Sequence, residues 1–218
     1  MERLDWFKWG LNFFECLACI TGFVYWHKLR NSHWKWFPVY LATILATELT
    51  GKYIQNVSLN LNLYKFFGLP VQFLFFFWLF AKEVDNKGFK RLVYWGTFIY
   101  VASWLTDVLY LSNLSTPKFW FSSSSYTVGN IILVLIICRF FFNFINTDAI
   151  IYYKSSMIFW VTVGLIIFYL GTLPFFGLRN ILYYNYRNIF WAYNYIQYVL
   201  DCLMYLFFSI AFVWGKPK

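Results

Sequence analysis

Charged side chains are scarce in this sequence of 218 residues. They make up 12% of the chain, against about a quarter in typical soluble domains, while hydrophobic residues make up 61%. A soluble domain of this length keeps a polar exterior, so this composition excludes a soluble fold, a conventional α/β enzyme and a disordered segment. With only 4 cysteines, a disulfide scaffold is excluded as well.

Histidine is almost absent, and the two present, His27 and His33, fall in or beside a polar loop. The motifs H-E-x-x-H, G-x-S-x-G and G-x-x-x-x-G-K-[ST] do not occur in the sequence. Cys16 and Cys19 are spaced as C-x-x-C inside an apolar segment without further ligands nearby, so we expect both to be small apolar residues of a helix face. We therefore expect no enzyme activity, no bound metal and no cofactor.

Long apolar runs dominate the chain instead. A helix needs about 20 apolar residues to cross a hydrocarbon core near 30 Å thick. Seven such runs cover about residues 6–26, 36–55, 62–81, 92–111, 119–140, 157–176 and 189–212. Tryptophans, whose rings favour the headgroup level, recur at the ends of these runs. The pattern predicts an all-α polytopic membrane protein, a single seven-helix transmembrane domain over residues 1–218 with the lipid bilayer as its first partner.

The basic residues indicate the orientation of this bundle. Most of the 18 Lys and Arg residues lie in the loops after the first, third and fifth runs and at the C-terminus. The positive-inside rule then places the N-terminus outside and the C-terminus in the cytoplasm. The charge of +9 is spread over several loops without a long basic stripe, so nucleic acid is not an expected partner. Pro70 and Pro174 fall inside runs and are expected to kink them.

Ionisable and amide side chains inside the runs are the candidate functional residues, because they are costly in hydrocarbon. Glu48 and Lys52 share one face of the second run with a favourable i, i+4 spacing. With the N-terminus outside, most of the polar groups lie in the outer half or near mid-depth. We expect an outward-facing polar pocket lined by Glu15, Glu48, Lys52, Lys65, Gln72, Asp107, Asn130, Asn194, Gln197 and Asp201. The alternative is that these groups pair with one another between helices without any ligand.

Three segments resemble a group of small bacterial seven-helix membrane proteins. They are residues 47–53 (TELTGKY), 63–64 (LY) and 159–174 (FWVTVGLIIFYLGTLP). The last segment combines Gly164, Gly171 and Pro174, and the two glycines share a helix face that permits close approach of a neighbour. The resemblance implies the fold and a bacterial inner-membrane location but no activity. The span number also resembles the 3+1+3 bundles of SWEET-type sugar facilitators, although their Pro-Gln pair is not present here.

We therefore expect a sensor, a receptor-like protein or an interaction protein. A small molecule or lipid headgroup would occupy the outward pocket. The basic cytoplasmic loops would communicate the ligand-bound state to a protein partner. Two alternatives stay open. A small-solute transporter would use the same cavity, with Asp201 or Glu15 as a proton carrier, and an accessory or defence protein would act by oligomerising in the membrane.

Overall fold

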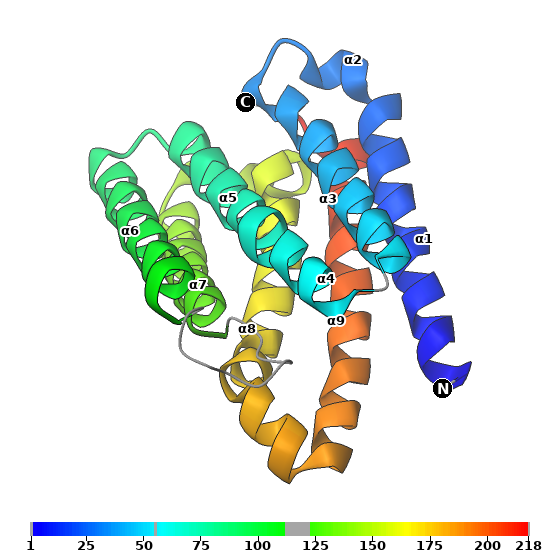
Figure 1. Ribbon diagram of the computed structural model, residues 1–218. Coiled ribbons are helices and arrows are strands. Elements are labelled where there is room, and N and C mark those ends of the chain that lie inside the picture. The colour runs from blue at the N-terminus through cyan, green and yellow to red at the C-terminus, as the bar shows by residue number, and fades with distance from the viewer. Residues whose placement is uncertain (1, 55, 112–122, 218) are drawn as a thin grey trace. The chain divides into compact units, whose positions relative to one another are not determined.

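The computed structural model describes residues 2–54, 56–111 and 123–217. These residues are almost entirely helical and form no β-strand, which confirms the all-α prediction (Figure 1). The chain divides into two compact units.

Unit 1 comprises Met1–Leu45, Ile137–Thr172 and Trp191–Lys218. Its short elements are α2 (Trp26–Leu29) and the 3-10 turns η1 (His33–Lys35) and η4 (Asp148–Ser155). Its long helices, some of which continue beyond the unit, are α1 (Glu2–Val24), α3 (Trp36–Tyr53), α7 (Ser123–Ile145), α8 (Met157–Asn185) and α9 (Arg187–Trp214).

Aromatic rings and close helix contacts form the core of unit 1. Phe37 of α3 is fully buried, and its ring centroid lies 5.1 Å from that of Phe208 and 5.3 Å from that of Phe212, both on α9. Gly164 of α8 faces α9 so closely that a Cβ there would lie 3.1 Å from the backbone oxygen of Met204. The glycine therefore fixes how near α8 and α9 approach.

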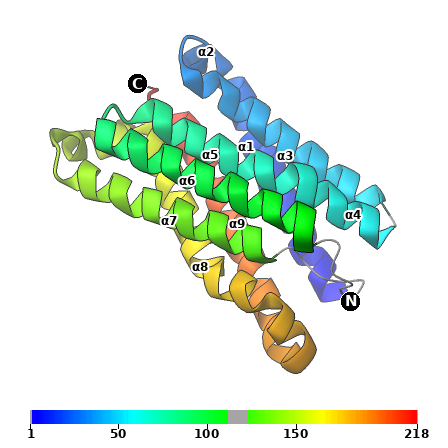
Figure 2. The same cartoon turned by 60° about the vertical axis from the view of Figure 1, so that its left-hand side comes forward.

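Unit 2 comprises Ala46–Ile136 and Leu173–Phe190. Its remaining elements are α4 (Val57–Leu63), the π turn η2 (Tyr64–Gly68), α5 (Leu69–Glu83), α6 (Lys87–Thr106) and the π turn η3 (Asp107–Leu111). Asn56 and Asn86 cap α4 and α6, each accepting two backbone N–H bonds at its side-chain oxygen. Helices α5 and α6 lie side by side (Figures 1 and 2).

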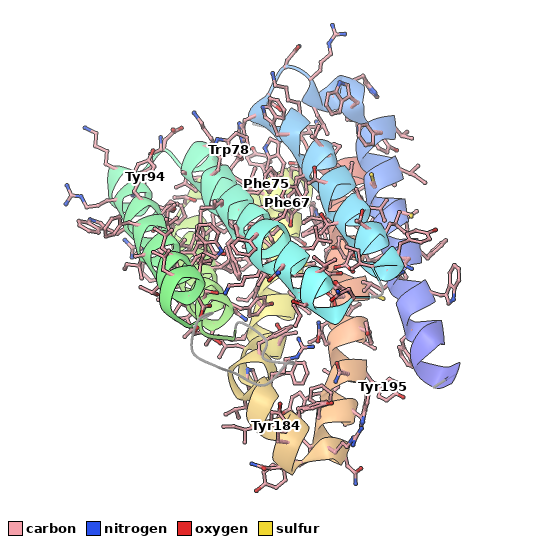
Figure 3. The ribbon with its side chains drawn as sticks, viewed as in Figure 1. Phe67, Phe75, Trp78, Tyr94, Tyr184 and Tyr195 are labelled. Atoms are coloured by element: carbon pink, nitrogen blue, oxygen red, sulfur yellow. The ribbon has the colours of Figure 1, made fainter. Side chains whose placement is uncertain are left out.

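The core of unit 2 is an aromatic cluster around Phe73 of α5. The Phe73 ring centroid lies 5.0 Å from that of Tyr100 on α6 and 5.5 Å from that of Tyr126 on α7. Gly129 of α7 makes room for this cluster, because a Cβ there would lie 2.9 Å from both Phe73 and Tyr100. A second aromatic pair on α5, Phe75 and Trp78, has centroids 5.7 Å apart (Figure 3).

Five helices are long and apolar enough to cross a membrane. They are Ser58–Glu83, Lys87–Leu109, Ser124–Ile145, Met157–Arg179 and Arg187–Trp214. Large apolar side chains on these helices face outward; Phe98 is 65% exposed and Leu135 57% exposed. Such surfaces are unfavourable in water and indicate a membrane protein.

The two other predicted runs are also helical. Trp9–Val24 forms a shorter apolar helix, and α3 has 18 residues but is not one of the five. The predicted end of the second run at Gln55 and the start of the fifth at Phe119 lie outside the described residues.

A π turn precedes Pro70, and the kink expected at this residue stays a prediction. Pro70 is the second residue of α5 and has no N–H to donate to the carbonyl of Phe66. The preceding backbone adopts η2, in which the hydrogen-bond register is widened. By contrast, α8 continues through Pro174 to Asn185.

We expect Gly164→Ala to destabilise the protein by about 1–3 kcal/mol, because the added methyl group would overpack the α8–α9 contact. Gly177→Ala, in the same helix, is the matched control: a Cβ there meets no atom within 4 Å. The control should be neutral or stabilising by up to about 1 kcal/mol. Thermal unfolding in detergent, followed by circular dichroism, measures both. Equal midpoints for the two variants would contradict the close α8–α9 contact.

Candidate functional site

Two π turns of unit 2 carry the candidate site. Lys65 lies in η2, and Asp107 is the first residue of η3. Lys65 Nζ donates a hydrogen bond to the backbone carbonyl oxygen of Asp107 at 3.1 Å, and Trp104 Nε1 donates to the backbone carbonyl oxygen of Lys65 at 3.0 Å. The turn η2 is therefore joined both to η3 and to the end of α6. Single π turns inside longer helices occur frequently at functional sites.

Asp107 also holds the first turn of α7. Its carboxylate accepts a hydrogen bond from Ser124 Oγ at 2.8 Å and another from the backbone N–H of Ser125 at 3.2 Å. The first N–H groups of a helix lack intrahelical acceptors and carry partial positive charge, so a carboxylate is stabilising there. Asp107 is only 3% exposed. The cap explains how this carboxylate is accommodated in an apolar bundle.

Glu48 of α3 is bound to η2. Tyr64 Oη donates to Glu48 Oε2 at 2.9 Å. The adjacent Gly51 allows this approach, since a Cβ there would lie 2.8 Å from Tyr64 Oη. Asn60 Nδ2 adds a bond to the backbone carbonyl oxygen of Gly51 at 3.0 Å. The exposed Lys52 interacts electrostatically with Glu48.

These contacts form separate hydrogen-bonded groups within unit 2, and η2 contributes to two of them through its consecutive residues Tyr64 and Lys65. We call these groups together the π-turn network. Its members are Glu48, Gly51, Asn60, Tyr64, Lys65, Trp104, Asp107, Ser124 and Ser125. Of the predicted pocket residues, Lys65 and Asp107 are joined directly, and Glu48 is bound to the neighbouring Tyr64. With an ammonium group, two carboxylates and hydroxyl groups, the network has the chemistry to hold a small charged or zwitterionic molecule.

Asn130 of α7 lies deeper in the same unit. It is 0% exposed, and among the described residues neither its Nδ2 nor its Oδ1 has a hydrogen-bond partner. A buried amide without partners is unfavourable, and an unobserved water or ligand group is the usual explanation. Asn130 follows Ser124 by six residues, about 9 Å along the helix axis.

The remaining predicted residues are divided between the units. Gln72 is half-buried on α5 in unit 2. Glu15 is 4% exposed in unit 1, where it interacts electrostatically with Tyr40 and Cys202. Three further predicted residues are half-buried on α9 of unit 1, namely Asn194, Gln197 and Asp201. A single pocket lined by all ten residues stays a prediction.

Asn60, Tyr64 and Trp104 belong to the network, although the sequence pattern does not single them out as ligand-binding residues. Trp104 resembles the many other tryptophans near helix ends, and the bond of its indole to the Lys65 carbonyl depends on tertiary contact. The bond of Tyr64 to Glu48 likewise depends on tertiary contact, because it joins residues 16 apart in the sequence.

The four cysteines of the chain form no disulfide in the structure. Cys16, Cys19, Cys138 and Cys202 are free thiols. Over the described ranges, no group of three or more His, Cys, Asp or Glu side chains is placed to hold a metal ion.

Comparisons of the chain with protein-family models, with curated proteins and with solved structures gave no match. The function is therefore argued from the chemistry and geometry of its own residues.

We expect Asp107→Ala to lower the free energy of unfolding by about 1–3 kcal/mol, because the Ser125 N–H loses its acceptor in a buried environment. Asp85→Ala is the matched control. Asp85 is 82% exposed and pairs with Lys90 at 3.2 Å, and such surface pairs contribute about 0–1 kcal/mol. Thermal unfolding in detergent measures the difference, and a loss for Asp107→Ala no larger than that of the control would contradict the capping role.

Proposed function

We propose that the chain crosses a bacterial inner membrane seven times, with its N-terminus outside and its C-terminus in the cytoplasm. Five apolar helices of sufficient length, the helix Trp9–Val24 and α3 supply the seven segments. Helix α3 carries Glu48 and Lys52, and the Tyr64–Glu48 hydrogen bond gives the carboxylate a partner within the protein. The excess of Lys and Arg in alternate loops supports the orientation.

In this topology the π-turn network lies toward the outer face, and the protein acts as a sensor of a small charged molecule or lipid headgroup. The Lys65 ammonium group, bound to the backbone carbonyl of Asp107, is the observation that carries the proposal. A neutral carbonyl is a weaker acceptor than a phosphate or carboxylate, so an anionic ligand group competes for Lys65. The Glu48 carboxylate is suited to accept from an ammonium group or hydroxyl of the same ligand.

Transfer of Lys65 to a ligand would separate η2 from η3. Because Asp107 caps α7, a displacement of η3 changes the first turn of a helix that runs unbroken from Ser123 to Ile145. A ligand shifts such an equilibrium only as far as it binds the two states differently. Competition between the ligand and the Asp107 carbonyl supplies that difference. The basic cytoplasmic loops are the proposed contact with a protein partner.

A small-solute transporter is the second candidate function, and Asn130 is the observation that favours it. Because its donor and acceptor atoms have no partner within the described part of the chain, this buried amide is suited to exchange hydrogen bonds with a passing solute. Uptake of a labelled solute into proteoliposomes would favour the transporter over the sensor.

We expect phosphoethanolamine, which carries a phosphate and an ammonium group, to stabilise the purified protein in lipid nanodiscs. At a concentration of about 100 Kd the stabilisation would be about 2.7 kcal/mol. Lys65→Met and Glu48→Gln should each remove most of this increase, because each deletes one charge that faces the ligand. Thermal unfolding with and without phosphoethanolamine measures the effect.

Lys82→Gln is the matched control, since Lys82 is an exposed lysine at the opposite end of α5 from η2. It should retain the full stabilisation by phosphoethanolamine. The proposed ligand site would be wrong if the wild-type protein showed no stabilisation, or if the Lys65 and Glu48 variants responded as the control does.

A further inference from the structure

Unit 1 contains a cavity of about 870 Å³. We call it the lysine cavity. Its lining includes Lys28, Tyr153, Lys154, Trp160, Trp214 and Lys216. They come from α2, the end of η4, the first turn of α8 and the end of the chain. The volume lies within the range of about 300–1,000 Å³ that is typical of small-molecule sites.

The wall formed by the end of the chain is fixed by backbone contacts. The backbone N–H of Lys216 donates to the carbonyl oxygen of Ser155 at 2.8 Å, in an isolated bridge between the two segments. Gly215 lets the chain cross the start of α8, because a Cβ there would lie 2.7 Å from Met157 Cα. The cavity is therefore built by chain segments that are distant in sequence and held together.

The cavity is positively charged. Three lysines line it, and none of its lining residues is acidic. Lys28 Nζ donates to the backbone carbonyl oxygen of Val213 at 3.2 Å, and Lys154 Nζ lies 5.9 Å from the ring centroid of Tyr153. The N-terminal end of the long helix α8, which carries partial positive charge, lies beside them. This combination favours an anion with more than one oxygen acceptor.

Aromatic side chains form the other part of the lining. The ring centroids of Trp160 and Trp214 lie 5.9 Å apart. Trp160 Nε1 donates to the backbone carbonyl oxygen of Lys154 at 2.9 Å, which fixes the indole beside the lysine. Tryptophan favours the depth of lipid headgroups. The site thus combines cations for a phosphate with apolar rings for the glycerol and acyl carbons next to it.

We propose that the lysine cavity binds the phosphate group of an anionic phospholipid. All of its lining residues belong to unit 1, so the inference does not depend on the π-turn network. In the proposed topology the lysines lie on the cytoplasmic side, where anionic lipids attract basic residues.

A second basic surface, on α6, provides a contrast. Lys87, Lys90, Arg91, Tyr94, Trp95 and Phe98 line it. All six belong to one helix, and Tyr94 is 63% exposed. Lys90 also pairs with Asp85 at 3.2 Å. This surface has cations and aromatic rings but lacks walls from several chain segments, so it tests whether positive charge alone accounts for lipid binding.

The test uses the full chain in detergent, titrated with phosphatidylglycerol or with zwitterionic phosphatidylcholine, and native mass spectrometry to count bound lipids. The triple variant Lys28→Gln, Lys154→Gln, Lys216→Gln should lose affinity for phosphatidylglycerol by roughly fivefold for each lysine removed. The matched triple variant Lys87→Gln, Lys90→Gln, Arg91→Gln removes the same charge from α6 and should change the affinity little. Phosphatidylcholine should bind more weakly than phosphatidylglycerol.

Equal losses in the two triple variants, or no loss in the lysine-cavity variant, would overturn the proposal. If the lysine-cavity variant fails to fold, Lys154→Gln replaces it, because Lys154 is exposed and its ammonium group makes no hydrogen bond among the described residues. An unchanged affinity in that single variant would likewise overturn the proposal. Competition with soluble glycerol phosphate identifies the source of the phosphate: weak competition supports the lipid, and full displacement at equal concentration overturns it in favour of a soluble phosphate ester.

Discussion

A bilayer offers no water to polar groups, so every donor and acceptor within it needs a partner in the protein. The hydroxyl groups of Thr162, Thr172 and Ser209 meet this constraint by donating to the carbonyl oxygen four residues before them. The π-turn network meets it on a larger scale. Lys65 donates to a backbone carbonyl and Asp107 accepts from the first turn of α7, so both charged side chains are used to join helices of unit 2.

The helices could be predicted from the sequence because each follows from a local run of apolar residues. The π turns could not, since hydropathy records composition and is insensitive to a change in hydrogen-bond register. Pro70 indicated an irregularity in the helix, but the sequence did not show that this irregularity would be a π turn. The contact of Asp107 with Ser125 joins residues 18 apart, so it depends on how α6 and α7 approach each other. Glu48, Lys65 and Asp107 could be identified as candidates because polar side chains are unfavourable in the hydrocarbon core. Their hydrogen-bond partners could be identified only from the three-dimensional structure.

The spatial arrangement of the basic loop residues could not be predicted from the sequence either. In the sequence, Lys28, Lys154 and Lys216 indicate only the orientation of the protein in the membrane. The positive-inside rule uses the number of Lys and Arg residues in each loop and does not predict their positions in space. In the structure the three lysines line one cavity whose wall depends on the bridge between Ser156 and Lys216. Conversely, polar residues that were expected to line a single outward-facing pocket are divided between two units, with Glu15 in one and Glu48 in the other. Depth along a helix therefore predicts which groups need partners but not which groups meet.

Side-specific labelling of single cysteines tests the seven-span account most directly. In a variant in which the four native cysteines are replaced by serine, the exposed residues Lys52, Lys82 and Lys154 are changed to cysteine one at a time. A membrane-impermeant maleimide is then applied to intact spheroplasts. The account predicts labelling of Lys52→Cys in intact spheroplasts, and of Lys82→Cys and Lys154→Cys only after the membrane is permeabilised. Labelling of Lys52→Cys and Lys82→Cys from the same side would contradict it.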